Sequence, residues 1–330
     1  MFETKDFAVV ILNWNGKALL EKFLPSVLKY SQDATIYVAD NASTDNSVAF
    51  VSEEFPTVKI IKNSQNGGYA KGYNDALKSV KEPLLCLLNS DIEVTENWLQ
   101  PILKEFKTNK NTAIIQPKIL DYKNKTHFEY AGAAGGFLDK FGYPYCRGRI
   151  FDSIEEDKGQ YNNTSTIFWS SGACLFIRNV VFKELGGFDE SYFAHMEEID
   201  LCWRAFNKNY KSKYVGASTV YHVGGATLSN TNSKKTYLNF RNSLFTLVKN
   251  TDSNVFIKTI IRMKLDAVAA LRFLLQFKLQ HFFAILKAHF SFYKNLRRIL
   301  KQRKQLPKRP NYYECNSIVW SYFIKKRRTF

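Results

Sequence analysis

The first 95 residues alternate between short apolar runs and segments with helical spacing. Apolar runs occupy residues 7–12, 35–39, 58–61 and 84–88, and a polar stretch follows each of them. Between the first two runs, apolar residues recur every three or four positions over 19–28, as on one face of a helix. This order of strand, polar loop and helix predicts an α/β fold with a mostly parallel central sheet.

Small, amide or acidic residues follow every predicted strand. In a parallel α/β sheet the carboxyl ends of the strands share one edge, and ligands bind along it. A set of amides and carboxylates at that edge suits a ligand with a base, a ribose and phosphates. The side chains expected to gather there are Asn13, Asn15, Asp40, Asn41, Asp45, Asn66 and Asp91.

The fourth run, residues 84–88, is continuous and leads directly into Asn89-Ser90-Asp91. It predicts a fully buried central strand that places Asp91 at the ligand edge. A carboxylate there could hold a divalent cation that bridges two phosphates, since hard cations take carboxylate and phosphate oxygens. The alternative is that Asp91 only caps the following turn.

Two common phosphate-binding motifs are absent. A dinucleotide fold needs Gly-x-Gly-x-x-Gly directly after its first strand, but residues 13–16 are Asn-Trp-Asn-Gly. Gly67, Gly68 and Gly72 fall in a later loop with a different spacing, and no segment matches the P-loop pattern. We therefore do not expect a nicotinamide-dependent enzyme.

Residues 111–178 follow a less regular pattern, in which glycines interrupt an aromatic, loop-rich stretch. A strand is predicted again over 166–177, and its segment from Ser170 to Gly172 is small enough for a ligand to approach closely. We assign this half to a second substrate, with Trp169 and Gly172 as acceptor-side candidates.

A glycine pair at 186–187 ends one predicted helix, and an acidic turn begins the next. The turn carries three carboxylates, Glu197, Glu198 and Asp200, which repel one another unless a ligand, a cation or proton transfer offsets the cost. Asp200 also stands four residues before Arg204, a spacing that predicts an ion pair. The alternative is an acidic helix start stabilised only by the helix dipole.

Five motifs, taken together and in order, resemble family 2 glycosyltransferases, in the branch that includes bacterial rhamnosyltransferases. The resemblance covers about residues 7–225. It implies a GT-A fold, a nucleotide-sugar donor, a divalent cation (Mg²⁺ or Mn²⁺) and transfer with inversion at the anomeric carbon. The motifs are Val9–Asn15, Asp40–Asp45, Asn66–Ala70, Asn89–Asp91 and Gly186–Leu201.

The resemblance also implies roles for individual residues. The base-binding loop falls on Asn13 and Asn15, and the acid that contacts uracil or thymine falls on Asp40. The metal aspartate falls on Asp91, and the catalytic base falls on Glu198. The other donor-side candidates are Asn41, Asp45, Asn66, Gly67, Gly68 and Asn89.

The chain departs from the family pattern at two places. Asn89 stands where an aspartate usually begins the Asp-x-Asp motif, and an amide binds a cation more weakly than a carboxylate. Glu197 and Glu198 stand where a Glu-Asp pair usually supplies the base, so Glu197 and Asp200 are kept as further candidates. His222 aligns with a late histidine that binds the metal in some relatives, and the alternative is a structural histidine.

The net charge of +17 is concentrated near the C-terminus. Residues 251–330 hold 18 Lys and Arg against 3 acidic residues, which gives +15 and leaves +2 for residues 1–250. The basic part therefore needs its own explanation. The predicted division is a catalytic domain at 1–230, with a nucleotide-binding half at 1–95 and an acceptor half at 111–225, and a basic, aromatic, mainly helical extension at 231–330.

The extension combines apolar bulk with basic residues. Residues 265–293 are rich in Leu, Phe and Ala, but Arg272, Lys278 and Lys287 interrupt them, so no spanning helix is expected. An amphipathic helix at an anionic membrane surface fits better, and the alternative is a helical subdomain packed on the catalytic domain. The side chains expected at the membrane are Leu271, Leu274, Leu275, Phe282, Phe283, Leu286, Trp320, Tyr322 and Phe323.

The cysteines and the N-terminus bear on the compartment. The 5 cysteines are scattered without Cys-x-x-Cys spacing, which indicates a reducing compartment and no structural zinc. Residues 1–6 lack a basic segment followed by an apolar core, so no secretory signal is expected. We expect a cytoplasmic protein that lies on the inner face of the cell membrane.

These observations favour an enzyme, namely an inverting, membrane-peripheral glycosyltransferase that acts on a lipid-linked saccharide in bacterial cell-surface polysaccharide synthesis. Asn89 leaves open a catalytically inactive sugar-nucleotide binder. The basic extension alone would also suit a nucleic-acid-binding protein, but the nearly neutral remainder carries no recognition motif, so no nucleic-acid partner is expected. A processive synthase is not expected, because no multi-span region is present.

Overall fold

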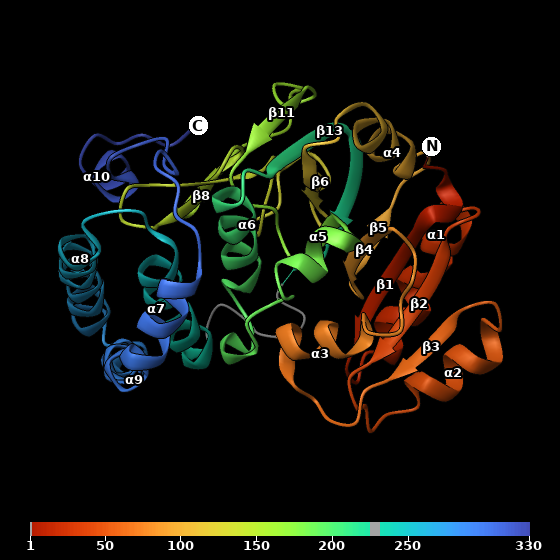
Figure 1. Cartoon of the computed structure of the whole chain (residues 1–330), viewed down its shortest axis with the longest axis horizontal. Helices are drawn as coiled ribbons and strands as arrows, with labels where there is room; N and C mark the ends of the chain where they lie inside the picture. The colour runs from red at the N-terminus through yellow and green to blue at the C-terminus, as the bar shows by residue number, and fades with distance from the viewer. Residues whose placement is uncertain (1, 225–231) are drawn as a thin grey trace.

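The computed structural model describes residues 2–224 and 232–330. A mixed sheet of nine strands runs through this part of the chain, with separate apolar cores on its two faces (Figure 1). The strand order is β11-β13-β6-β12-β4-β1-β2-β3, and β5 pairs with β13 outside this path. The strands are β1 (Phe7–Asn13), β2 (Thr35–Asp40), β3 (Lys59–Lys62), β4 (Leu84–Asn89), β5 (Ile92–Val94), β6 (Thr112–Asp121), β11 (Thr164–Ile167), β12 (Cys174–Arg178) and β13 (Lys211–His222).

The first half of the sheet is parallel, as the repeating sequence pattern predicts. β1 lies between β2 and β4 and runs parallel to both, and β3 continues the sheet beyond β2. Because β1 and β4 are covered on both faces, their sequences are continuous apolar runs and do not alternate. The helices between these strands are α1 (Lys17–Tyr30), α2 (Ser47–Glu54) and α3 (Gly68–Ala76).

Beyond β4 the sheet becomes mixed. β12 runs antiparallel to β4 and β6, whereas β13 runs parallel to β6 with a break in register between Val215 and Thr219. β5 also pairs with β13, with Ile92 opposite His222. This pairing brings the end of β13 beside the turn that carries Asp91. The helices of this half are α4 (Leu99–Thr108), α5 (Asn179–Glu184) and α6 (Glu197–Asn207).

The glycine-rich region between β6 and β11 forms a second, antiparallel sheet in the order β10-β9-β8-β7. Gly136 packs directly on the Trp169 ring and has no room for a side chain, which accounts for the glycine at the start of β7. The strands are β7 (Gly136–Leu138), β8 (Pro144–Cys146), β9 (Arg149–Ile150) and β10 (Ser153–Ile154).

The C-terminal extension is mainly helical, and its first helix packs on the rest of the protein. α7 contacts both α6 and α9, and its Leu244 and Leu247 are fully buried. Arg303 donates to Val248 O at 2.9 Å and so binds the last turn of α7. The helices are α7 (Ser233–Asn250), α8 (Val255–Leu275), α9 (Leu279–Gln305) and α10 (Ile318–Phe323).

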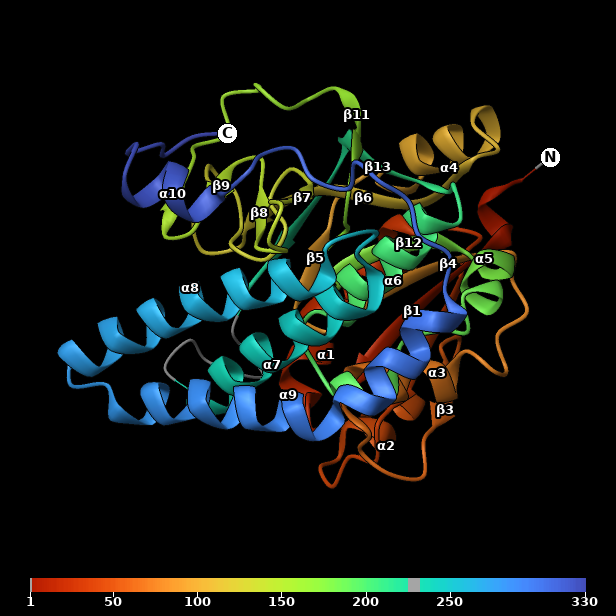
Figure 2. The same cartoon turned by 60° about the vertical axis from the view of Figure 1, so that its left-hand side comes forward.

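α8 and α9 form a long antiparallel hairpin along one side of the molecule (Figure 2). After α9 the chain returns to the small sheet, where Ile318 N–H donates to Asp139 Oδ2 at 3.0 Å and Tyr312 hydroxyl donates to Lys140 O at 2.6 Å. No helix of the described chain combines the length and the apolar character needed to cross a bilayer.

Two side chains expected at a membrane surface are less accessible than the sequence pattern predicts. Tyr322 is buried, because it packs on Phe151 and its hydroxyl lies 3.2 Å from Ser153 Oγ. Phe282 is half-buried. Helical spacing alone did not show which face of each helix meets the protein. The remaining predicted side chains are exposed: Leu271, Leu274, Leu275, Phe283, Leu286, Trp320 and Phe323.

Candidate active site

The polar residues that end β1 and β2 meet at one edge of the sheet, as predicted. Asn13 stands opposite Asp40, and its Nδ2 donates to Asp40 Oδ1 at 3.3 Å and to Ser47 Oγ at 2.9 Å. The N–H of Ser43 donates to the other oxygen of Asp40 at 3.0 Å. The sequence pattern does not single out Ser43 or Ser47, because serines in a polar loop are common.

Asn15 and Asp45 tie the loop after β1 to the loop after β2. Asn15 has a left-handed backbone (φ 51°), and its Oδ1 accepts from the N–H of Thr44 at 2.7 Å. Asp45 Oδ2 accepts from the N–H of Lys17 at 3.1 Å, at the start of α1. Burial opposes ionisation of Asp45, but hydrogen bonds from Ser47 and Lys17 outweigh it and lower the pKa of this carboxyl.

Asn41 and Asn66 join the second loop to the start of α3. Asn41 Nδ2 donates to Asn66 Oδ1 at 3.0 Å and to Gly68 O at 3.1 Å. The N–H of Gly68 in turn donates to Asn66 Oδ1 at 3.0 Å. Gly67 is the N-cap of α3. Because the N–H of Asn41 also donates to Asn13 O at 2.8 Å, a connected set of hydrogen bonds runs from Asn13 at the end of β1 to Gly68 at the start of α3.

The start of α3 also contacts the segment before α6, far along the chain. Gly68 is left-handed (φ 76°), and a side chain there would collide with Phe193 O. The same carbonyl accepts from the N–H of Tyr69 at 2.8 Å. The structure therefore brings the Asn66-Gly67-Gly68 motif next to the acidic helix, a contact that no local sequence pattern predicts.

The two acceptor-side candidates make contacts within the protein. Tyr69 hydroxyl donates to Gly172 O at 2.8 Å, and a Cβ on Gly172 would lie 2.9 Å from that hydroxyl. The small residue therefore makes room for Tyr69. Trp169 is buried, and its Nε1 donates to Phe137 O at 2.9 Å. A direct role of Trp169 or Gly172 in acceptor binding stays a prediction.

Asp91 and His222, the two predicted metal ligands, lie side by side. Asp91 Oδ1 is 3.1 Å from His222 Nε2, and both side chains are buried. Backbone pairing supports the contact, since the N–H of Val223 donates to Asp91 O at 3.1 Å. Asn89 is the last residue of β4, and its N–H donates to Ala173 O at 2.9 Å.

Glu129 completes this cluster, although no sequence signal indicated it. Its Oε2 lies 3.4 Å from His222 Nδ1 and accepts from the N–H of Ala131 at 2.6 Å. Burial by itself lowers the pKa of His222, but the carboxylates of Asp91 and Glu129 outweigh it and raise the pKa to about 10. Glu129 lies in the irregular, glycine-rich region, where neither spacing nor periodicity marks a functional side chain.

The Asp91–His222 pair fits a divalent cation as a partial ligand set. The 3.1 Å separation is that of an ion pair in which protonated His222 donates to Asp91, so a cation that binds both side chains would have to displace this proton. A carboxylate oxygen suits Mn²⁺, and neutral imidazole is a common metal ligand in proteins. Residues 2–224 and 232–330 contain no group of three or more His, Cys, Asp or Glu side chains arranged to hold a metal. Phosphate oxygens and water would have to supply the remaining ligands.

The loop that leads into α6 is strained. Phe193, His195 and Met196 have φ angles of 66°, 68° and 73°, a left-handed region that costs non-glycine residues energy. Asn242 of α7 holds the loop, because its Nδ2 lies 3.0 Å from Ala194 O and 2.7 Å from His195 O. Asn242 is fully buried. A helix of the C-terminal extension thus fixes the turn that starts α6.

Glu197 and Glu198 begin α6 with carboxylates that lack full pairing. Among the described residues, Glu197 Oε2 and Glu198 Oε2 are buried atoms without a hydrogen-bond partner. Burial raises the pKa of Glu198 to about 7, against opposing backbone hydrogen bonds. Burial and the neighbouring Glu198 raise the pKa of Glu197 well above its usual value. A pKa of about 7 allows Glu198 to exchange a proton near neutral pH.

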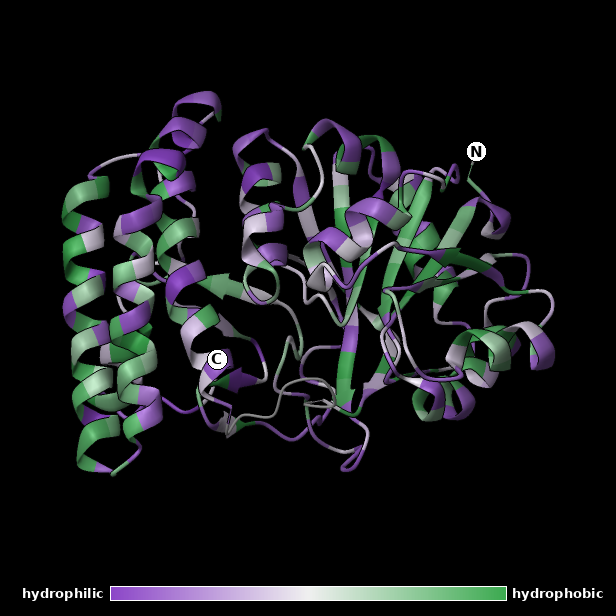
Figure 3. Cartoon of the chain, turned by 90° about the horizontal axis from the view of Figure 1, so that it is seen from below, coloured by the Kyte–Doolittle hydropathy of each residue, from purple (hydrophilic) through white to green (hydrophobic). Residues whose placement is uncertain are grey.

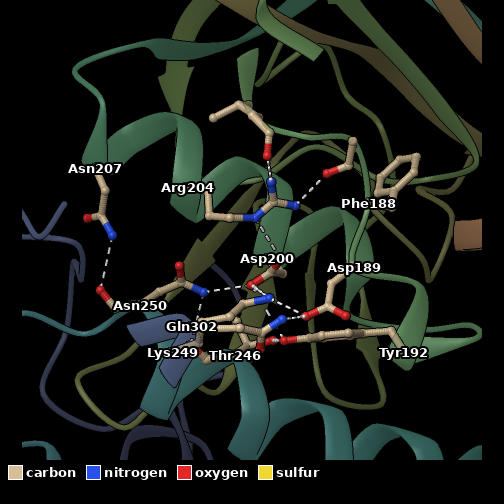
Figure 4. A network of polar contacts seen from close by, with 12 residues as sticks. Phe188, Asp189, Tyr192, Asp200, Arg204, Asn207, Thr246, Lys249, Asn250 and Gln302 are labelled. Carbon is tan, nitrogen blue, oxygen red and sulfur yellow. Dashed lines mark hydrogen bonds and ion pairs between the residues drawn. The ribbon is translucent and has the colours of Figure 1, made fainter. Parts of the chain in front are cut away.

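Asp200 differs from the two glutamates because its carboxylate is fully engaged (Figure 4). The predicted ion pair with Arg204 is confirmed at 2.8 Å. Lys249 Nζ lies 2.8 Å from the other oxygen, and Asn250 Nδ2 donates to it at 2.7 Å. Arg204 NH2 also donates to Gly187 O at 2.8 Å, which fixes the predicted glycine pair against α6.

A cavity of about 300 Å³ lies beside this network and away from the donor edge. Its charged lining groups are paired with one another, since Lys249 Nζ lies 2.8 Å from Asp189 Oδ2 and Gln302 Nε2 donates to the same oxygen at 3.0 Å. We therefore associate the reaction with the sheet edge and the start of α6, where polar atoms are left unpaired.

The sequence profile described as "Glycosyl transferase family 2" matches residues 8–186, more than half of the chain. The chain belongs to this family. The match includes the donor edge, Asp91 and the strand β12, and it ends just before the acidic helix α6. The protein is accordingly a glycosyltransferase, as the motifs predicted.

This glycosyltransferase has distant relatives of known activity. The N-acetylglucosaminyl-diphospho-decaprenol L-rhamnosyltransferase of Mycobacterium tuberculosis is 24% identical over 238 residues, which cover 66% of this chain and 76% of the relative.

Among solved structures, GalNAc-T7 with UDP, GalNAc and Mn²⁺ matches with a TM-score of 0.58 at 17% identity, over 75% of this chain and 48% of GalNAc-T7. S. aureus TarS 1-349 in complex with UDP-GlcNAc matches with a TM-score of 0.55 at 14% identity, over 91% of both chains. These similarities confirm the GT-A fold of the family 2 enzyme.

Proposed function

We propose that this glycosyltransferase moves a sugar, with inversion, from a nucleoside-diphosphate donor to a hydroxyl of a lipid-linked saccharide in cell-surface polysaccharide synthesis. The observation that carries the proposal is the pair of buried, unpartnered carboxylate oxygens of Glu197 and Glu198, which sits beside a hydrogen-bonded donor edge. Leaving such groups unpaired is costly, and catalytic sites are where proteins accept that cost.

In this proposal Glu198 is the general base. It takes the proton from the acceptor hydroxyl as that oxygen attacks the anomeric carbon, and the nucleoside diphosphate leaves from the opposite face. A base with a pKa of about 7 combines a sufficient ionised fraction at neutral pH with enough basicity to accept the proton. The raised pKa of Glu197 favours its protonated form, which can donate a hydrogen bond.

The donor would lie along the polar edge of the sheet. Asn13, Asn15 and Asp40 would contact the base. The residues that would line the ribose and diphosphate are Asn41, Asp45, Asn66, Gly67, Gly68 and Asn89. Asp91 and His222 would hold Mg²⁺ or Mn²⁺. When bound, that cation stabilises the negative charge that develops on the leaving diphosphate.

The acceptor and the membrane form the second part of the proposal. The name of the mycobacterial relative describes a sugar carried on a diphospho-decaprenol, and an acceptor of that chemistry is presented at a membrane surface. The +15 charge of residues 251–330 would favour an anionic surface. We therefore propose that the enzyme works as a peripheral protein on the inner face of the cell membrane.

A panel of nucleotide sugars tests this function. Purified enzyme should release nucleoside diphosphate from one or a few donors, and only when Mn²⁺ or Mg²⁺ is present. Transfer to a synthetic lipid-diphosphate saccharide should give a product whose anomeric configuration is opposite to that of the donor. Tight donor binding without any turnover on such acceptors would instead indicate a catalytically inactive sugar-nucleotide binder.

A further inference from the structure

The α8–α9 hairpin carries apolar side chains on its outward face. On α8, positions 257, 260, 264, 268, 271 and 275 follow helical spacing, and all are apolar except Lys264. Phe277, in the turn between the helices, is 89% exposed. Figure 3 shows apolar colour concentrated toward this end of the hairpin. On α9 a second exposed stripe follows the same spacing through Leu279, Phe283, Leu286, Phe290 and Tyr293.

The inward face of α8 is polar, which reverses the usual arrangement of a surface helix. Lys258, Thr259, Arg262 and Asp266 are its buried residues together with Ala270. Helices of water-soluble proteins normally bury their apolar face, because that removes apolar area from water. In α8 the apolar face is exposed to solvent.

Polar contacts hold α8 in this orientation. Arg262 Nε pairs with Asp266 Oδ1 at 2.9 Å, and Arg262 NH1 donates to Gly142 O at 3.2 Å. Tyr143 hydroxyl donates to Asp266 at 2.7 Å. Turning the apolar face inward would break the contacts with Gly142 O and the Tyr143 hydroxyl, and these two groups would then face apolar side chains without hydrogen-bond partners, which costs free energy. The exposed apolar face is therefore a fixed feature of the fold.

The charge of the hairpin restricts what can cover this face. Residues 255–305 contain 12 Lys and Arg against a single acidic residue, Asp266, which is buried. A second copy of the chain would bring an equally basic face, and like charges oppose that contact. An anionic surface with an apolar interior matches both the charge and the side chains.

We propose that the outward face of the α8–α9 hairpin, with Phe277 at its tip, inserts shallowly into a bilayer that contains anionic lipids. The apolar stripes would reach the acyl boundary, while Lys264, Arg272, Lys278 and Lys287 extend their charged ends to lipid phosphates. This inference rests on the membrane part of the proposed function and names the surface responsible for it.

Vesicle binding by the full chain tests the proposal. The double variant Leu275→Glu/Phe277→Glu should lose about ten- to a hundredfold in partitioning onto phosphatidylcholine vesicles with phosphatidylglycerol, because two exposed apolar side chains no longer enter the acyl region. The matched control is Val180→Glu/Ile154→Glu, which changes two exposed apolar residues elsewhere and should bind like the wild type. Metal-dependent donor hydrolysis should be unchanged in both variants.

A fluorescence measurement locates the inserted residue. Phe277→Trp should be quenched by brominated lipid in the vesicles, whereas Val180→Trp should not. Equal vesicle binding by the wild type and the Leu275/Phe277 variant would overturn the inference. So would a dimer in light scattering that the double variant converts to a monomer, since the face would then bind a second copy. If the wild type ignores vesicles but still transfers sugar to a soluble acceptor, the membrane proposal fails and the chemistry stands.

Discussion

The donor edge and the start of α6 differ in how far their polar side chains are hydrogen-bonded. At the donor edge, Asn13, Asp40 and Asn41 make hydrogen bonds to neighbouring loops, and only Asn13 Oδ1 among their side-chain atoms is buried without a partner within the described residues. At α6, the buried oxygens Glu197 Oε2 and Glu198 Oε2 have no hydrogen-bond partner in the described part of the chain. A satisfied polar network is rigid and presents a defined surface for binding. An unsatisfied carboxylate has a raised pKa and is available to exchange a proton.

The two regions also differ in how they are supported. The donor edge is built from short loops that follow consecutive strands. The α6 turn is strained, and its support comes from Asn242 and Lys249 of α7, far along the sequence. The comparison predicts that changes at the donor edge affect ligand affinity, whereas changes around α6 affect turnover.

The largest effect is expected at Asp91, which follows β4 and lies beside His222. Asp91→Asn should reduce metal-dependent turnover to background, because it removes the carboxylate beside His222 and Asn89 cannot replace its charge. A lost metal contact is worth several kcal/mol of transition-state stabilisation, or about 10³-fold and more in rate. Turnover should be measured at limiting Mn²⁺, with circular dichroism as the check on folding. Activity like that of the wild type would show that turnover does not need a cation held by Asp91.

Glu198→Gln should lower turnover by about 10²–10⁴-fold, the usual contribution of a positioned general base. Donor affinity should hardly change, because the base acts on the acceptor and contributes mainly in the transition state. Glu197→Gln is the matched control, since its side chain leaves the helix about 100° away. If Glu197→Gln is the inactive variant, Glu197 is the base. If both variants are active, the proton goes elsewhere, and Asp200 would be tested next.

The pH dependence of the same enzyme sharpens this test. A carboxyl group whose pKa is raised to about 7 keeps its proton below that pH and cannot act as a base there. The turnover of the wild type should therefore rise as the pH increases through about 7 and then level off. The residual activity of Glu198→Gln should lack this rise. The profile should be measured from about pH 5 to about pH 8, a range that includes the expected value of about 7. A wild-type profile that is flat over this range would contradict the assignment.

A variant of Asn242 tests whether the strained loop before α6 contributes to catalysis. Asn242→Asp keeps the size of the side chain but removes the N–H donors to Ala194 O and His195 O. We expect turnover to fall by about 10–10²-fold, since small displacements of catalytic groups have effects of this size. Donor affinity, measured by calorimetry, should stay within about twofold.

The control for Asn242 is Asn295→Asp on α9. Within residues 2–224 and 232–330, Asn295 Nδ2 donates only to the carbonyl of Ser291 one turn earlier, so the loss of this donor should leave turnover intact. Equal losses of turnover and donor affinity in Asn242→Asp would show a general structural role for this residue.

The smallest effect is expected at Glu129. Glu129→Gln should weaken Mn²⁺ binding by about 10–100-fold, because the carboxylate that orients His222 is removed. Electron paramagnetic resonance of free Mn²⁺ measures this directly, without reference to activity. Glu156→Gln, at an exposed position of the same region, should bind Mn²⁺ like the wild type. Unchanged affinity in Glu129→Gln would show that Glu129 only packs beside His222.

The sequence by itself determined the parallel half of the sheet and the residues at its ligand edge. Continuous apolar runs occur where strands are covered on both faces, and polar residues follow them because the carboxyl ends of parallel strands face a ligand. Each of these signals is local. The Asp200–Arg204 pair was predictable for the same reason, since helical geometry alone places residues four apart side by side.

Tertiary structure decided the features that depend on residues distant in sequence. Glu129 reaches His222 from an irregular loop, and Asn242 reaches the α6 turn from the C-terminal extension. The orientation of α8 is of the same kind. Its composition predicted an amphipathic helix, but the burial of its polar face follows from contacts with Gly142 and Tyr143, which only the folded chain brings together.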